Sequence, residues 1–189
     1  MNPMPFARCV GAVLAAVLAA PVYPATWQSV QAESKLEFIA SYEGAEAPGQ
    51  FGQFAVTTSF DPLSLVTSSI LVDVDITSAS MGNAEIDEAI AQPEWFDAAA
   101  FAQAEFRSEK IHATNDLEYV AEGILSLKGV KKPVTVPFRW RPHGRNAEMT
   151  GSLTLSRVDF DIGSGEWETD ASIGHAVQVR FRIVLKAEE

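Results

Sequence analysis

The stretch from residue 121 to residue 140, AEGILSLKGVKKPVTVPFRW, consists of two alternating runs joined by a short turn. Within each run, small or apolar residues occupy every second position. Successive side chains of a β-strand point to opposite faces, so this period is typical of half-buried strands. The segment between the runs, KGVKKP at residues 128–133, contains the Gly and Pro that mark turns. The stretch predicts an antiparallel hairpin with one apolar face that the rest of the chain has to cover.

The same two-residue period recurs along most of the chain and predicts an all-β protein. Further strands are expected at residues 34–42, 50–60, 66–76, 104–111, 146–156 and 176–186. A loop is expected at residues 44–49, which include Gly44, Pro48 and Gly49. Together with the hairpin, the total is about eight strands in one antiparallel domain.

One segment has a helical period instead. Asn83 is a good helix N-cap, and Ile86 and Ile90 lie four residues apart, as on one face of a helix. Pro93 follows and cannot continue a helix. The sequence therefore predicts one short helix between two strands.

About eight antiparallel strands, each with one apolar face, have two main arrangements. A sandwich buries the faces against each other, whereas a closed barrel buries them inside. A strand of about ten residues spans about 33 Å, so a barrel of this size can enclose one long, thin ligand. The pattern of apolar residues leaves both arrangements open.

The N-terminus reads as an export signal. Arg8 precedes an apolar run at residues 10–20, and Pro21 and Pro24 interrupt the chain before the small residue Ala25. The run is too short to span a membrane, so we expect a secretory signal peptide at residues 1–25, cleaved after Ala25. The domain at residues 26–189 is then periplasmic. A buried core helix is the alternative, but the run has no amphipathic pattern.

Charge and cysteine content exclude several classes of protein. The chain has 14 Lys and Arg against 25 Asp and Glu, a net charge of −11, and a nucleic-acid partner requires a basic face. Cys9, the only cysteine, lies inside the predicted signal, so we expect neither a disulfide nor thiol chemistry in the domain.

Motifs for catalysis or metal binding are weak. His112, His143 and His175 lie in separate segments and lack metal-ligand spacing, and no phosphate loop or nucleophile motif is present. We therefore expect no cofactor, no metal and no enzymatic activity. Four acids crowd one segment and form a solvated turn, the paired carboxylates of a hydrolase or a cation site: Asp159, Asp161, Glu166 and Glu168.

Several short motifs occur in a particular order. They are FxxF at 51–54, FDP at 60–62, WFD at 95–97, AxFxS at 104–108, GxLxLKGVxxPVxxPF at 123–138 and LxRxDFxIGxGEW at 155–167. In this order and spacing the chain resembles the YceI-like family of bacterial periplasmic proteins. The resemblance implies a lipocalin-like antiparallel barrel whose interior holds an isoprenoid chain, such as a polyprenyl phosphate or an isoprenoid quinone.

The resemblance turns the aromatic residues into candidates for a ligand cavity, although a filled core is the alternative. The candidates are Phe38, Phe54, Phe60, Trp95, Phe96, Phe106, Phe138, Trp140, Phe160 and Trp167. A head group at the barrel mouth needs a few polar partners, for which Arg157 and Lys128 are candidates, together with Lys131 and Lys132. Charges on solvated turns are the alternative for these four residues.

The function expected from the sequence is periplasmic binding or transport of an isoprenoid lipid. The alternative, which the resemblance alone suggests, is an accessory module that docks on a membrane b-type cytochrome and serves quinone redox chemistry or oxidative-stress defence. Whether the protein forms a homodimer is left open.

Overall fold

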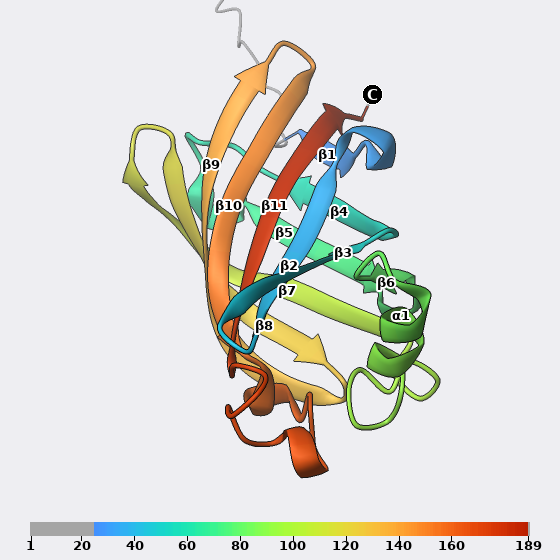
Figure 1. Ribbon diagram of the computed structural model, residues 1–189. Helices are drawn as coiled ribbons and strands as arrows, with labels where there is room; N and C mark the ends of the chain where they lie inside the picture. The colour runs from blue at the N-terminus through green and yellow to red at the C-terminus, as the bar shows by residue number, and fades with distance from the viewer. Residues whose placement is uncertain (1–24, 189) are drawn as a thin grey trace, which may run out of the picture.

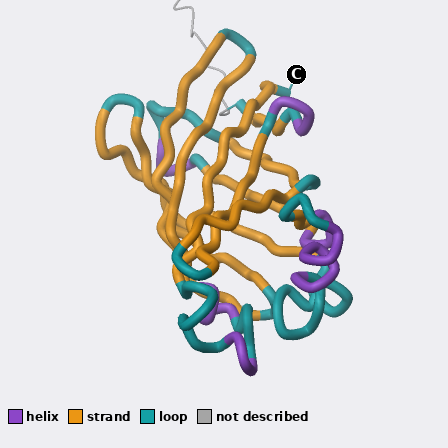
Figure 2. Tube along the Cα trace, viewed as in Figure 1, coloured by secondary structure: helices purple, strands orange, loops and turns teal. Residues whose placement is uncertain are grey.

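The computed structural model describes residues 25–188 and shows a β-barrel whose longest connecting segments gather at one end (Figures 1 and 2). The predicted signal peptide and its cleavage site lie almost wholly outside these residues. The strands are β1 (Thr26–Ser29), β2 (Lys35–Tyr42), β3 (Ala45–Phe51), β4 (Phe54–Ser59), β5 (Ser69–Asp75), β6 (Ala79–Ser80), β7 (Gln103–Asn115), β8 (Glu118–Leu127), β9 (Val130–His143), β10 (Asn146–Ser156) and β11 (Ala176–Ala187). The helices are α1 (Ala84–Ile90) and the 3-10 turns η1 (Gln31–Glu33), η2 (Leu65–Thr67), η3 (Ile76–Ser78), η4 (Arg157–Phe160) and η5 (Gly165–Trp167).

Eight of these strands close a ring, in the order β1-β4-β5-β7-β8-β9-β10-β11 and back to β1. The other three, β2, β3 and β6, form a branch that starts from β11. Strand β11 pairs with β1 through Leu185, Lys186 and Ala187, and with β2 further back, from Gln178 to Arg182. The prediction of an eight-stranded antiparallel barrel with one helix is confirmed, and the sandwich is excluded.

The central hairpin and the helix form where the sequence predicts them, but the turn is shorter than predicted, since residues 130–133 belong to strand β9. Strands β8 and β9 pair from Leu127↔Val130 onward, around a turn in which Lys128 and Gly129 both have positive φ, 48° and 75°. This two-residue turn fits the right-handed twist of the strands. Asn83 caps α1, because its Oδ1 accepts hydrogen bonds from the amides of Glu85 and Ile86.

The largest difference from the sequence prediction is at residues 44–49, where the structure has strand β3 instead of a loop. A tight turn at Glu43 and Gly44, with φ of 49° and 81°, returns the chain directly onto β2. Gly49 lies opposite Phe38, and a Cβ at Gly49 would be 2.2 Å from Cζ of that ring. This glycine therefore makes room for an aromatic ring across a strand pair rather than forming a loop.

Two boundaries also differ. The strand predicted at residues 50–60 is broken at Gly52 and Gln53 into β3 and β4. Strand β1 closes the ring, but its four residues are too few to show a reliable period. The sequence therefore predicts the correct number of ring strands with β2 in the place of β1.

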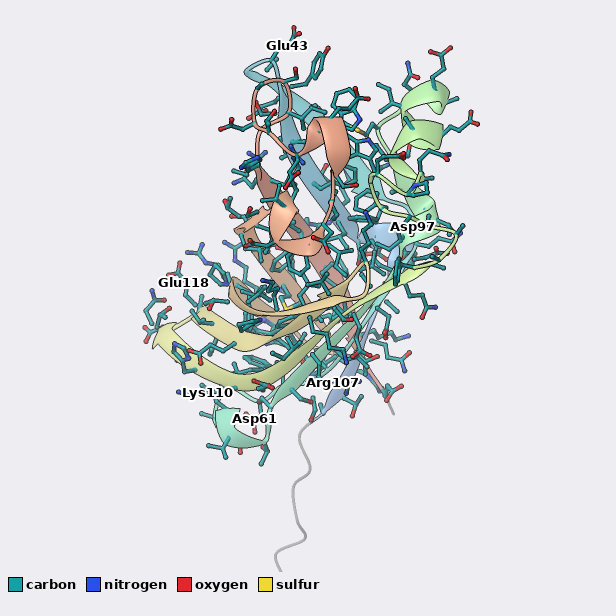
Figure 3. All side chains as sticks on the ribbon, turned by 90° about the horizontal axis from the view of Figure 1, so that it is seen from below. Glu43, Asp61, Asp97, Arg107, Lys110 and Glu118 are labelled. Carbon is teal, nitrogen blue, oxygen red and sulfur yellow. The ribbon has the colours of Figure 1, made fainter. Side chains whose placement is uncertain are left out.

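The barrel is closed at one end by aromatic side chains, and the other end bears α1, η4 and η5. Figure 3 places Glu43 beside the coil of η4 and η5 and Asp61 on the far side of the molecule. No helix within residues 25–188 is long and apolar enough to cross a membrane.

Candidate ligand-binding cavity

The inward side chains of the barrel enclose a cavity with an apolar wall. Its volume is about 230 Å³ for the centres of water-sized molecules, whereas one water needs roughly 10–15 Å³ on the same measure. Branched aliphatic residues at every second position of β5, β9, β10 and β11 form much of the wall. Its aromatic residues are Phe38, Phe51, Phe54, Trp95, Phe96, Phe106, Phe138, Phe160 and Phe181. Arg157 is the one polar or charged residue among the described residues that line it.

The structure brings most of the aromatic candidates to this cavity, but not all of them. Seven candidates line it: Phe38, Phe54, Trp95, Phe96, Phe106, Phe138 and Phe160. Phe60 and Trp140 lie beyond the cavity in the closed end of the barrel, and Trp167 lies outside it with its ring 5.8 Å from that of Trp95.

The closed end of the barrel is an aromatic floor beneath the cavity. Phe60 is 3% exposed, and the centroid of its ring lies 4.6 Å from that of Trp140 and 5.0 Å from that of Tyr119. Phe138 faces both the floor and the cavity, with its ring 5.7 Å from that of Phe60. Edge-to-face and tilted contacts of this kind fill space densely, so the floor seals this end of the barrel.

Two segments cover the other end and are called the lid here: residues 91–102 and residues 157–175. The amides of Gly163 and Ser164 in the second segment donate to the carbonyl oxygen of Glu94 in the first, at 2.7 and 2.9 Å. The second segment is also attached to the β2–β3 hairpin, because the Glu43 amide donates to the Ser172 carbonyl at 2.7 Å. The lid is therefore one connected structure.

Lys128 fastens both lid segments to the central hairpin. Its Nζ donates to the carbonyl oxygens of Pro93 and Asp161, each at 2.7 Å. The left-handed turn that precedes β9 directs this side chain across the barrel end. Two of the three ammonium donors of Lys128 are therefore used within the protein.

Arg157 is 3% exposed and is surrounded by backbone carbonyl groups. Its guanidinium donates to Ile162 and Gly163 through Nη1, to Trp167, Thr169 and Ile173 through Nη2, and to Gly174 through Nε, at distances from 2.5 to 3.1 Å. A guanidinium has five N–H groups, so all of them are occupied. Its Cζ also lies 5.7 Å from the ring centroid of Trp95. Arg157 thus has no N–H group left for a ligand head group, and it fixes the shape of the lid.

Burial governs the pKa of both cations. It lowers the pKa of the Lys128 ammonium, and the charges of Asp97, Asp161 and Glu94 act in the opposite direction. It also lowers the pKa of the Arg157 guanidinium, against the charge of Asp170. Arginine remains protonated in proteins, so Arg157 carries a buried positive charge.

The lid is acidic. Its carboxylates are Glu94, Asp97, Asp159, Asp161, Glu166, Glu168 and Asp170. The four acids of the predicted acidic turn are exposed. No group of three or more His, Cys, Asp or Glu side chains in the described part of the chain is arranged to hold a metal ion. The geometry agrees with a solvated turn.

Sequence reasoning missed two aromatic residues of the cavity wall, Phe51 and Phe181. Phe181 shares the face of Val177 and Val179, so the period of the last strand was sufficient to find it. The two-residue period could not identify Phe51, because the break at Gly52 and Gln53 changes which positions face inward.

Comparison with protein families and with known proteins gives consistent matches. The model of a family described as the YceI-like domain matches residues 27–185. A UPF0312 protein of Vibrio parahaemolyticus is 30% identical over 138 residues, which is 69% of this chain and 73% of that protein. A UPF0312 protein of Shewanella baltica is 27% identical over 169 residues, which is 86% of this chain and 88% of that protein.

Solved structures share the fold. Burkholderia cenocepacia BcnA is 29% identical with a TM-score of 0.80, and the match covers 82% of this chain and 98% of BcnA. A domain from Saccharophagus degradans, described as polyisoprenoid binding, has a TM-score of 0.70 at 14% identity over 86% of this chain and 98% of that domain. The YceI protein of Campylobacter jejuni has a TM-score of 0.65 at 18% identity over 77% of this chain and 86% of that protein.

Proposed function

Because the chain belongs to the YceI-like family, we propose that it binds a long apolar isoprenoid lipid inside its barrel. The apolar cavity is the observation that carries this proposal. Protein interiors contain few voids larger than a water molecule, and an empty cavity destabilises the fold in proportion to its volume. A cavity of about 230 Å³ therefore exceeds a packing defect and is suited to a ligand.

The chemistry of the wall defines the ligand class. Arg157, the one charged residue of the wall, has no N–H group left for a ligand, since its donors are all occupied by carbonyl groups. A ligand is then held by apolar contact, which contributes on the order of 0.8 kcal/mol for each buried CH₂ group. A branched hydrocarbon chain can make such apolar contacts throughout the cavity. The description of the Saccharophagus degradans domain as polyisoprenoid binding supports this ligand class.

The lid favours an uncharged head group over a phosphate. Its carboxylates are numerous, and both Lys128 and Arg157 donate to backbone groups. A phosphate at this end of the barrel would be repelled by several carboxylates, with few free donors to compensate. Of the two ligands that the family resemblance implies, an isoprenoid quinone therefore fits better than a polyprenyl phosphate.

The predicted export signal would place this binding function in the periplasm. A carrier or a store in an aqueous compartment must shield a lipid from water, and a barrel with a sealed floor and a covered mouth does so.

The proposal is tested by titrating delipidated protein with three probes that share a chain of four isoprene units: geranylgeraniol, geranylgeranyl phosphate and a menaquinone. Intrinsic tryptophan fluorescence reports binding, because Trp95 lies in the cavity wall. We expect saturable binding of the alcohol and the quinone, and weaker binding of the phosphate. Failure of all three to bind would contradict the proposal.

A further inference from the structure

One junction in the barrel wall is paired over only half its length. Strands β9 and β10 pair from His143↔Asn146 to Phe138↔Gly151. From there toward the lid, β9 continues as the partner of β8, and β10 continues as the partner of β11. In Figure 1 the two strands separate in this direction. The space between residues 130–137 of β9 and residues 152–156 of β10 is called the seam here.

Two prolines of β9 explain why the seam is unpaired. Pro133 and Pro137 both lie in the continuous ladder with β8, opposite Ile124 and Val120. Proline has no N–H group, so it is tolerated in a ladder where the missing N–H would face away from the partner strand. At these positions that direction is toward β10. Strand β9 therefore has fewer donors to offer β10 along the seam, and β10 diverges at Gly151.

The cavity extends to both sides of the seam. Val134 and Val136 of β9 and Leu153 and Leu155 of β10 line it. Thr135, between the two valines, is exposed. Along the seam, cavity and solvent are thus separated by side chains and not by paired strands.

The second lid segment closes the seam from the end. It begins where β10 ends, and η4 contacts both β9 and β10. Phe160 and Ile162 of this segment are buried and line the cavity. The segment is held at its start by the Arg157 amide, which donates to the His175 carbonyl, and at its end by the bridge between Ile173 and Tyr42.

Between these two attachments, residues 158–171 form a flap. Four of its carbonyl groups accept from the guanidinium of Arg157: those of Ile162, Gly163, Trp167 and Thr169, at 2.9, 3.1, 2.5 and 3.1 Å. A single buried side chain therefore holds the flap at several points along its length.

We propose that the ligand enters and leaves the cavity sideways through the seam, and that Arg157 is the positioning residue that holds the flap across it. Displacement of the flap exposes the seam without breaking any β-strand pair. This inference rests on the proposed function, because it describes the route to the same cavity.

The test is a bulky adduct at the edge of the seam. Cys9, the only cysteine of the chain, lies in the predicted signal peptide, so a single cysteine can be introduced into the barrel domain without a competing thiol. Thr135→Cys modified with a polyethylene glycol maleimide places bulk at the seam. Thr57→Cys with the same adduct is the matched control, since Thr57 is exposed on β4, which pairs with both of its neighbours.

Stopped-flow mixing with geranylgeraniol measures association, and displacement by excess quinone measures dissociation. The adduct at Thr135→Cys should slow both rates by about tenfold or more and leave the dissociation constant within about twofold, because a blocked route changes the barrier and not the end states. The adduct at Thr57→Cys should change neither rate. Equal rates for the two adducts would overturn the seam as the route.

Arg157→Lys provides a second, independent readout. A lysine keeps the charge but has only three donors, so it cannot hold the same carbonyl groups. Association and dissociation should both become faster, by about fivefold to tenfold, with a smaller change in the dissociation constant. Unchanged association would contradict the role of Arg157 at the flap. If no probe binds the unmodified protein at equilibrium, the proposed function fails, and the route fails with it.

Discussion

Gly163 lies directly against the guanidinium of Arg157. Its carbonyl oxygen accepts from Nη1 at 3.1 Å, its φ is +75°, and a Cβ at this position would be 2.2 Å from Nη1. The glycine therefore satisfies two requirements at once, a left-handed backbone and a close approach to a buried side chain.

The first prediction follows from this contact. Gly163→Ala should lower the free energy of unfolding by about 2–4 kcal/mol, because it combines backbone strain with a clash against Arg157. Gly144→Ala is the matched control, since Gly144 also has a positive φ, 64°, but has nothing within 4 Å of the added Cβ. It should cost about 1 kcal/mol. Urea unfolding measures both, and equal costs would contradict a tight contact.

The second prediction concerns the volume of the cavity. Val72→Phe adds bulk to the wall, so it should weaken binding of geranylgeraniol by about tenfold or more. The melting temperature should be unchanged or higher, because the new ring fills an empty space. Thr57→Phe places the same side chain on the outside of the barrel and should leave binding unchanged. A lower melting temperature with intact binding would indicate a packed core at Val72.

The third prediction is a dependence of stability on pH through Lys128. Burial lowers the pKa of its ammonium group in the folded state below the ordinary value of 10.5. At a pH between the lowered pKa of the folded state and 10.5, the unfolded chain binds more protons than the folded protein. The free energy of unfolding should therefore increase as the pH rises toward 10.5. Lys128→Met should lose this gain.

Guanidinium unfolding across the alkaline range, with wild type and Lys128→Met compared at each pH, measures the effect. Lys131→Met is the control, because Lys131 lies at the start of β9 and is exposed. A difference between wild type and Lys128→Met that is constant with pH would contradict burial of the charged group.

The fourth prediction addresses the choice of head group. Asp97 and Asp161 both act on Lys128, so Asp97→Asn with Asp161→Asn reduces the negative charge near this lysine. Affinity for geranylgeranyl phosphate should rise by about fivefold at low salt, and affinity for geranylgeraniol should stay unchanged. Asp73→Asn with Asp116→Asn, outside the lid, is the charge-matched control. An equal effect of the two pairs would attribute the preference to net charge alone.

Much of the fold was predictable because the alternation of side chains is strong in the long strands. The hairpin of β8 and β9 and the N-cap at Asn83 follow directly from their local sequence. Strand β3 could not be predicted in this way, because Pro48 and Gly49 are typical of loops. Gly49 is instead required by the ring of Phe38, which lies opposite it on another strand. The local sequence pattern does not contain information about contacts between strands.

The candidate site was predictable in its composition but not in its arrangement. Aromatic residues such as Phe54 and Phe106 face inward at the expected positions. Phe60 and Trp140 have the same local pattern but lie below the cavity, since depth along the barrel depends on strand stagger. Arg157 and Lys128 were predicted as partners of a head group, and only the structure shows that both side chains donate to backbone carbonyl groups.

The most direct test is native mass spectrometry of the protein purified from a bacterial periplasm, followed by extraction and identification of any bound molecule. We predict one bound lipid per chain, with an isoprenoid tail and an uncharged head group. A protein that is empty as isolated, and remains empty after incubation with isoprenoid quinones and alcohols, would contradict it.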